Sequence, residues 1–238
     1  MPQSGQLRPA GRDFHVWLNS RESTARRRFS HAHEICHLLI PGYLSNSKCR
    51  TDATTGEYRR QQEEEYLCDV GASELLMPVH MFAPSISRPL HLDSLLEVAR
   101  RFDVSLEAAG IRLTQCDIEE CAVIVWEEAL KKSQIREMKS QAALPGMERF
   151  APRPRLRIRF ASTSPGMRKH YFPPERSADA ECLVNRCLEI DSVVSGNCYL
   201  PTGNGLVEFA TESIDAPYRR GNLRQNRVIT IARPKRRG

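Results

Sequence analysis

The sequence predicts an α+β protein made of consecutive small domains, and three observations support this prediction. Two long segments with helical periodicity, residues 25–40 and 57–77, follow a short alternating segment at residues 14–19 that is typical of a strand. The rest of the chain alternates between short helical patterns and runs of β-forming residues. At 238 residues, with 40% hydrophobic residues, the chain is long for one compact unit. We therefore expect three domains, at residues 1–90, 91–118 and 119–238.

The two long helices of the first expected domain have clear ends in the sequence. The first is expected to stop at Pro41 and the second at Pro78, because proline does not continue a helix. Polar residues 46–56 between them predict a loop. Small residues at 68–73 would let another helix approach the second helix closely. Two helices and one strand are therefore expected to frame the first domain.

The second expected domain has the outline of a helix-turn-helix. Leucine, alanine and phenylalanine side chains form one helical stripe from Leu92 to Phe102, and residues 103–105 predict a turn that ends in the N-cap residue Ser105. A second helix is expected at residues 106–113, and its first residues offer few groups that contact bases or phosphates. We therefore favour a scaffold role for this segment over DNA binding.

The third expected domain mixes strands and helices. Helical patterns cover residues 127–141 and 178–188, and residues 145–154 are typical of a linker. Strand patterns are found at residues 121–126, 155–160, 206–209 and 227–232. This order predicts a domain of the α+β class.

The segment His33-Glu-Ile-Cys-His37 carries the strongest chemical signal in the chain. His33 and His37 are four residues apart, so in a helix both imidazoles lie on one face and can bind one metal ion. Glu34 lies one step round the helix, where it can act as a general base on a metal-bound water. Catalytic zinc usually has three protein ligands and one open position. The motif therefore requires a third ligand from another segment.

A run of three glutamates, Glu63, Glu64 and Glu65, supplies the candidates for this third ligand. Glu65 has Asp69 one turn later on the same helical face, so the first can bind metal while the second accepts the free ring N–H of a ligating histidine. The alternative is a solvated acidic run without a ligand role. We favour Glu65 as ligand because it accompanies the HExxH motif.

The charge of the chain is concentrated near its end. The formal net charge is +6 and the sequence pI is about 9.0. Basic residues gather in the last twenty positions: Arg219, Arg220, Arg224, Arg227, Arg233, Lys235, Arg236 and Arg237. No aromatic residues are interleaved in the final stretch, so a solvated tail is favoured over a nucleic-acid-binding face.

The cysteines and the apolar runs bear on the cellular compartment. The chain has eight cysteines but no CxxC pair, and we expect free thiols rather than disulfides or zinc clusters. No segment approaches the roughly 18 consecutive apolar residues of a membrane helix, and residues 1–10 lack the apolar core of a signal peptide. A cytoplasmic protein without membrane contact is therefore expected.

Two blocks of the sequence resemble the paired signature of the ImmA/IrrE-like metallopeptidases, peptidase family M78. They are residues 28–37, which contain the HExxH motif, and residues 65–78, from Glu65 to Pro78. Residues 98–105 and 111–113 are also similar to the helix-turn-helix segment that follows the peptidase core in this family. The order of parts resembles the IrrE-type branch, which adds a GAF-like sensor domain. The resemblance implies a zincin-like peptidase core, a helix-turn-helix segment and a C-terminal GAF-like α+β domain.

The resemblance also implies an activity and a partner. It implies a cytoplasmic bacterial endopeptidase that cleaves a helix-turn-helix transcriptional repressor and so relieves repression in a stress or DNA-damage response. By the same resemblance His33, His37 and Glu65 bind the metal and Glu34 is the catalytic base. We expect Zn²⁺, although Mn²⁺ or Fe²⁺ accept the same ligands.

The position of the motif near Met1 leaves a second hypothesis open. Family members usually carry some tens of residues before the strand that precedes HExxH, whereas here the motif begins at His33. We expect either that the coding sequence starts further upstream or that the peptidase domain is shortened. In the second case the alternative function is a DNA-binding or sensor regulator without proteolysis.

Overall fold

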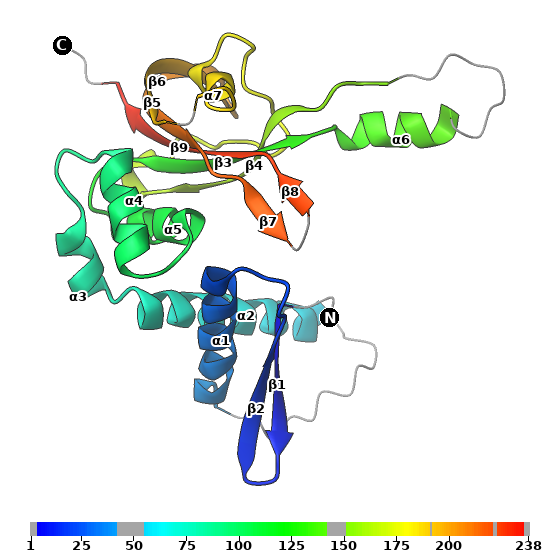
Figure 1. Cartoon of the computed structure of the whole chain (residues 1–238), viewed down its shortest axis with the longest axis vertical. Helices are drawn as coiled ribbons and strands as arrows, with labels where there is room; N and C mark the ends of the chain where they lie inside the picture. The colour runs from blue at the N-terminus through cyan, green and yellow to red at the C-terminus, as the bar shows by residue number, and fades with distance from the viewer. Residues whose placement is uncertain (1–3, 42–54, 142–150, 191, 221–222, 236–238) are drawn as a thin grey trace. The chain divides into compact units, whose positions relative to one another are not determined.

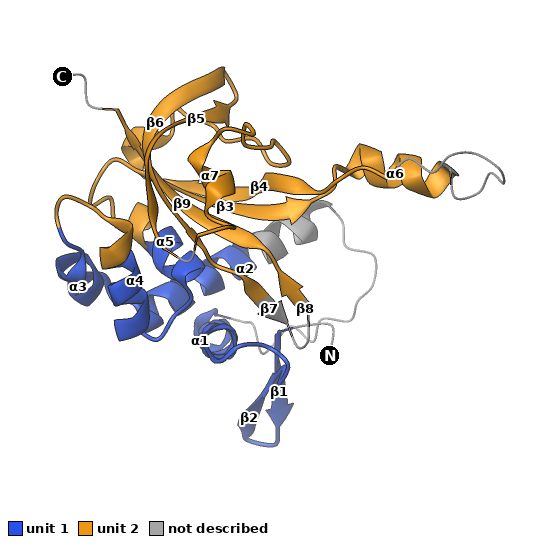
Figure 2. Ribbon diagram, turned by 45° about the horizontal axis from the view of Figure 1, so that its top comes forward, with its two compact units in different colours: residues 1–87, 95–112, 219–222 blue, residues 88–94, 113–218, 223–238 orange. Residues whose placement is uncertain are grey.

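The computed structural model describes residues 4–41, 55–141, 151–190, 192–220 and 223–235 (Figure 1). Helices and strands are both present throughout, so the predicted α+β class is confirmed. The chain divides into two compact units (Figure 2). Unit 1 comprises residues 1–87, 95–112 and 219–222; unit 2 comprises residues 88–94, 113–218 and 223–238.

Unit 1 begins with a β-hairpin. Strand β1 (Gly5–Ala10) pairs antiparallel with β2 (Asp13–Leu18), and the turn between them uses Gly11 at φ +67°, where glycine is favoured. Strand β2 confirms the predicted strand. Strand β1 was not predicted, because its short polar sequence contains a proline and lacks clear alternation.

Helix α1 (Thr24–Leu39) carries the HExxH motif and confirms the first predicted helix. It begins after Ser23, whose side chain accepts a hydrogen bond from the N–H of Arg26, and it ends at Ile40 before Pro41. Its buried positions include two residues of the motif, Glu34 and His37. The chemically active residues therefore lie on the face of α1 that packs inside unit 1.

Helix α2 (Thr55–Leu76) packs against α1 through its small residues. A Cβ atom added at Gly71 would lie 2.7 Å from Sγ of Cys36, so any larger residue would force this sulfur or the two helices to shift. Cys68 and Ala72 are also buried. The predicted second helix and its close helix contact are confirmed, while most of the predicted loop at 46–56 lies outside the described residues.

The remaining helices of unit 1 follow a short connection, α3 (Val79–Phe82) and the 3₁₀ turn η1 (Ala83–Ser85). The expected helix pair is present as α4 (Leu92–Arg101) and α5 (Leu106–Gln115), and Ser105 caps α5 by accepting from the N–H of Ala108. Arg28 of α1 donates to the carbonyl of Phe102 at 3.0 Å and forms an ion pair with Asp103 at 2.8 Å. The turn between α4 and α5 is thus tied to the motif helix.

Unit 2 is built on a five-stranded antiparallel sheet with the order β4-β3-β9-β6-β5. The strands are β3 (Ala122–Ala129), β4 (Arg155–Thr163), β5 (Val194–Thr202), β6 (Gly205–Asp215) and β9 (Arg227–Pro234). Helices α6 (Lys132–Gln141) and α7 (Leu183–Arg186) complete unit 2. Strands β7 (Tyr218–Arg220) and β8 (Leu223–Gln225) form a separate two-stranded sheet. Trp126 is fully buried in the core and donates from Nε1 to Thr230 Oγ1 at 3.0 Å.

Two predicted helices of unit 2 are wrong in extent. Residues 127–129 continue strand β3, because the carboxylates of Glu127 and Glu128 pair with Arg227 and Asn226 across the sheet. The helix α6 starts only at Lys132. Of the predicted helix at 178–188 only the four residues of α7 are helical. Residues 151–154 of the predicted linker lack regular structure, and the rest of that linker is not described.

The cysteines of unit 2 correct a further expectation. Cys182 and Cys198 form a disulfide with their Cα atoms 5.7 Å apart, although all the cysteines were expected to be free. The two residues lie before α7 and within β5, so only the folded chain brings them together. Cys36, Cys68, Cys116, Cys121 and Cys187 are not in disulfides. Within the part of the chain that the structure describes, no helix is long and apolar enough to cross a membrane.

Candidate metal centre

The facing sides of α1 and α2 bring the sequence-predicted site residues together. Helix α1 contributes His33 and His37, whose ring centroids are 4.9 Å apart, and α2 contributes Glu65 and Asp69. The histidines are mostly buried, whereas the side chains of Glu65 and Asp69 are each 59% exposed. Two helices, each with a four-residue spacing on one face, thus form a compact donor set.

The Glu65 carboxylate faces the same ring nitrogen of both histidines. Its Oε2 is 3.1 Å from Nε2 of His33, and its Oε1 is 3.7 Å from Nε2 of His37. Two imidazole nitrogens and one carboxylate match the ligand types of catalytic zinc sites. These donors fit a divalent metal ion.

The opposite nitrogen of each imidazole has its own partner. Nδ1 of His33 lies 2.9 Å from Oδ1 of Asp69, and this hydrogen bond raises the pKa of His33 above its ordinary value despite the opposing effect of burial. Nδ1 of His37 lies 3.3 Å from Sγ of Cys68. With protons on both Nδ1 atoms, Asp69 and Cys68 accept, and both Nε2 lone pairs are left to bind a cation together with the Glu65 carboxylate.

Cys68 is a competing third donor. One donor atom from each of His33, His37 and Cys68 lies within 4.8 Å of the others. Burial raises the pKa of the Cys68 thiol to about 12. The sulfur contacts Nδ1 of His37, whereas Glu65 spans the Nε2 atoms of both rings. Two arrangements of three donors are therefore possible, and they use different faces of His37.

Glu34 lies beside the histidines, under the N-terminal strand. The N–H of Leu7 donates to its carboxylate, and a Cβ atom added at Gly5 would lie 3.0 Å from its Oε1. Burial raises the pKa of Glu34 above its ordinary value, against the lowering effects of His33 and of the Leu7 hydrogen bond. Strand β1 therefore confines the carboxylate that the sequence predicts as a base.

A cavity of about 250 Å³ opens at these groups. Its lining combines Glu34 with the histidine and carboxylates of the donor set and with residues of β1 and α1: Ser4, Gly5, Arg26, Phe29, Ser30, His33, Glu34, Glu65 and Asp69. A ligand in this cavity would contact both the predicted base and two of the predicted metal ligands.

Three contributors to this site were not predicted from the sequence. Gly5 and Leu7 belong to the unpredicted strand β1, and no local pattern indicated that this strand would reach Glu34. Cys68 was interpreted only as a small residue at a helix contact. Its position three residues after Glu65 in a helix that faces the motif was an available signal for proximity to the histidines.

The N-terminal part of the chain matches known proteins. Residues 11–114 match the model of Peptidase_M78, described as the IrrE N-terminal-like domain. Over 102 residues the chain is 38% identical to the radiation response metalloprotease IrrE of Deinococcus deserti and 36% identical to that of Deinococcus radiodurans. These alignments cover 42% of this chain but only 36% and 30% of the two relatives.

The match spans about a third of the length of these curated relatives and contains the whole donor set. Both the motif helix α1 and its partner α2 fall inside residues 11–114, while strand β1 precedes them. Residues 11–114, which hold the whole donor set, are therefore similar to the IrrE N-terminal-like domain of the M78 metallopeptidases.

Proposed function

We propose that the chain is a metal-dependent endopeptidase in which His33, His37 and Glu65 hold one divalent ion and Glu34 is the general base. The observation that carries the proposal is the Glu65 carboxylate, which faces Nε2 of both histidines at 3.1 and 3.7 Å. Its fit to a catalytic ligand set and the names of the two relatives both support an enzyme of this class.

The chain's own residues supply the proton transfers and the orientation. A bound Zn²⁺ supplies a polarised peptide carbonyl and a water of lowered pKa. Glu34 takes the proton of the attacking water and passes it to the leaving amine. Its burial and its Leu7 partner hold the carboxylate in one place at the edge of the cavity. Mn²⁺ or Fe²⁺ could occupy the same donors.

Asp69 and Cys68 act as positioning residues in this proposal. Asp69 accepts the Nδ1–H of His33 and so fixes the tautomer whose Nε2 lone pair is free for the metal. Cys68 has the equivalent place beside His37, as a neutral thiol. We therefore assign Glu65, rather than Cys68, as the third ligand.

The substrate and the setting of the reaction extend the same proposal. The family resemblance implies that a helix-turn-helix transcriptional repressor is cleaved in a stress or DNA-damage response in the cytoplasm. The two relatives are named for a radiation response, which agrees with this setting. An unstructured linker of such a repressor could enter the open cavity as an extended segment.

The domain plan is proposed on the same grounds. Residues 1–90 would form a zincin-like peptidase domain, residues 91–118 a helix-turn-helix segment with a scaffold role, and residues 119–238 a GAF-like sensor domain. The helix pair α4–α5 and the five-stranded sheet with its helices support these assignments.

A cleavage assay tests the function. Glu34→Gln keeps size and polarity but removes the base, so cleavage of a helix-turn-helix repressor should slow by about 10²-fold or more while metal content is unchanged. Glu63→Gln, in the same glutamate run as Glu65, is the matched control and should cut as wild type does, and EDTA should stop both. A Glu34→Gln variant that cuts at the wild-type rate would exclude the chemistry. A wild-type chain that binds its metal and operator DNA but cuts no repressor would favour the regulator without proteolysis.

A further inference from the structure

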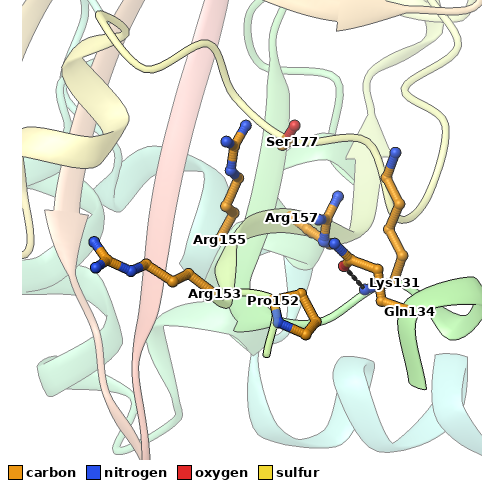
Figure 3. Close-up of a pocket in the computed structure, with 7 residues that line it drawn as sticks. All are labelled: Lys131, Gln134, Pro152, Arg153, Arg155, Arg157 and Ser177. Carbon is orange, nitrogen blue, oxygen red and sulfur yellow. Dashed lines mark hydrogen bonds between the residues drawn. The ribbon is translucent and has the colours of Figure 1, made fainter. Parts of the chain in front are cut away.

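Unit 2 contains a second cavity, of about 470 Å³, that the peptidase proposal does not use (Figure 3). Its lining is dominated by cationic side chains: Lys131, Gln134, Pro152, Arg153, Arg155, Arg157 and Ser177. The volume falls in the range of about 300–1,000 Å³ that is typical of small-molecule sites.

The basic residues reach this cavity through the alternation of strand β4 and the residues before it. Three arginines follow one another at every second position, Arg153, Arg155 and Arg157. Two alternate residues, Leu156 and Ile158, are buried in the core. Lys131 directly precedes α6 and Gln134 lies in its first turn, and the Lys131 N–H donates to Oε1 of Gln134 at 2.9 Å. Figure 3 shows Arg155, Arg157 and Lys131 pointing toward the segment that carries Ser177.

Arg157 is held in a fixed position at the cavity wall. Its residue is 5% exposed, its Nε donates to the carbonyl of Ala129 at 3.0 Å, and its Nη1 donates to the carbonyl of Glu175 at 3.1 Å. These neutral acceptors orient the guanidinium without cancelling its charge. Burial lowers the pKa of Arg157 most, the charge of Arg155 lowers it further, and the carboxylate of Glu175 opposes both effects.

Positive charge in the cavity is not balanced by its described lining. Four of the seven lining residues are cationic, and none of these seven carries a carboxylate. Of the neighbouring acids, Glu127 pairs with Arg227 at 2.7 Å, and Glu175 pairs with Lys132 at 2.7 Å while it offsets part of the charge of Arg157. A cluster of cations that repel one another in a cavity is stabilised by a bound anion.

We propose that this cavity binds a small anion that carries two or more phosphate groups. Guanidinium groups present paired N–H donors that match phosphate oxygens, and the first turn of α6 adds the positive end of a helix dipole. Pro152 is the one apolar residue among the described lining residues, and the carbon stems of the basic side chains contribute the other apolar surface of the cavity. The recessed place of Arg157 favours a small ligand over the backbone of a nucleic-acid duplex.

Titration calorimetry of the full-length chain with inorganic tripolyphosphate tests this proposal. Arg155→Gln and Lys131→Gln each remove one charge from an exposed side chain, and each should weaken binding by about ten- to a hundredfold, the range expected for a charge-assisted contact. Lys139→Gln, which removes the same charge from the exposed face of α6 outside the cavity, should bind as wild type does. Unchanged melting temperatures show that the variants are folded.

Two further ligands distinguish a phosphate site from a general anion site and from a nucleic-acid site. Citrate, with carboxylates in place of phosphates, should bind at least tenfold more weakly than tripolyphosphate, and a short DNA duplex should not compete with it. Binding that survives in both Arg155→Gln and Lys131→Gln, for example through the metal centre, overturns the proposal. Absence of binding to tripolyphosphate also overturns the proposal. So does a DNA duplex that binds more tightly than tripolyphosphate and loses affinity in Arg155→Gln and Lys131→Gln.

Discussion

The metal centre of unit 1 and the basic cavity of unit 2 are built in opposite ways. The metal centre uses residues at helical spacings on two helices, α1 and α2, and combines imidazoles with carboxylates, a donor set that attracts a cation. The basic cavity combines a strand, a helix start and an irregular segment, and its described lining has charge of one sign. In the first case a local pattern carries the chemistry, and in the second only the fold assembles it.

The largest effect is expected from a substitution at the helix contact of unit 1, which should change the metal centre and leave the basic cavity of unit 2 unchanged. Gly71→Ala places a Cβ 2.7 Å from Sγ of Cys36, so either the Cys36 side chain or the spacing of α1 and α2 must shift. We expect the free energy of unfolding to fall by about 1–3 kcal/mol and metal affinity to fall with it, because the ligands lie on both helices. Binding of tripolyphosphate in unit 2 should not change. Denaturant titration and metal titration measure the two effects.

A double-mutant cycle gives the control for this prediction. Cys36→Ala removes the sulfur that the added methyl group would meet, so Gly71→Ala should cost less in that background than in wild type. Equal costs in both backgrounds would mean that the sulfur contact does not set the helix spacing.

Much of unit 1 could be predicted because its pattern is local. Both long helices and the spacing that places His33, Glu34, His37, Glu65 and Asp69 near one another follow from helical periodicity. Strand β1 could not be predicted, because its partner β2 and the N–H that Leu7 offers to Glu34 are defined only by pairing. The position of Cys68 in α2 indicated that it lies near the histidines, but only tertiary packing decides that its sulfur contacts Nδ1 of His37.

Unit 2 shows where sequence patterns fail. Glu127 and Glu128 are common in helices, yet they end strand β3, because Arg227 and Asn226 pair with them on neighbouring segments. Tertiary structure also brings together the two cysteines of the disulfide, Cys182 and Cys198. In the same way it forms the cavity lined by Lys131, Arg155 and Ser177. Local spacing carries no information about such partners.

A smaller effect confined to the metal centre is expected for Asp69→Asn. The amide keeps the size of the side chain but no longer presents a charged acceptor to the Nδ1–H of His33. Loss of such an outer partner typically lowers metal affinity by about 10–100-fold, while Glu63→Gln should leave affinity unchanged. Competition against a chromogenic chelator gives both values. Unchanged affinity in Asp69→Asn would remove Asp69 from the positioning role.

The smallest effect concerns a carboxylate of unit 1 away from the metal. The pKa of Glu74 lies below its ordinary value. The largest cause is the hydrogen bond that its carboxylate accepts from the Val79 N–H, and the ion pair with Arg112 lowers the pKa further. A lowered folded-state pKa contributes stability above the unfolded-state pKa, and this contribution is lost as the pH falls through the folded-state value. Glu74→Gln should therefore flatten the acid-side decline of stability by less than about 1 kcal/mol, since the side chain is half exposed. Denaturant midpoints of both proteins across the acid range measure it, and parallel pH profiles would contradict the assignment.

The identity of the third ligand is the central claim, and metal content measures it directly. Purified wild type, Glu65→Gln and Cys68→Ala can be dialysed against a competing chelator and analysed for bound zinc by mass spectrometry. The geometry of Glu65, which faces Nε2 of both His33 and His37, predicts that Glu65→Gln loses the ion and that Cys68→Ala retains one per chain. A Cys68→Ala variant without metal, beside a Glu65→Gln variant that keeps it, would contradict this account and place the ion on the thiol side of His37.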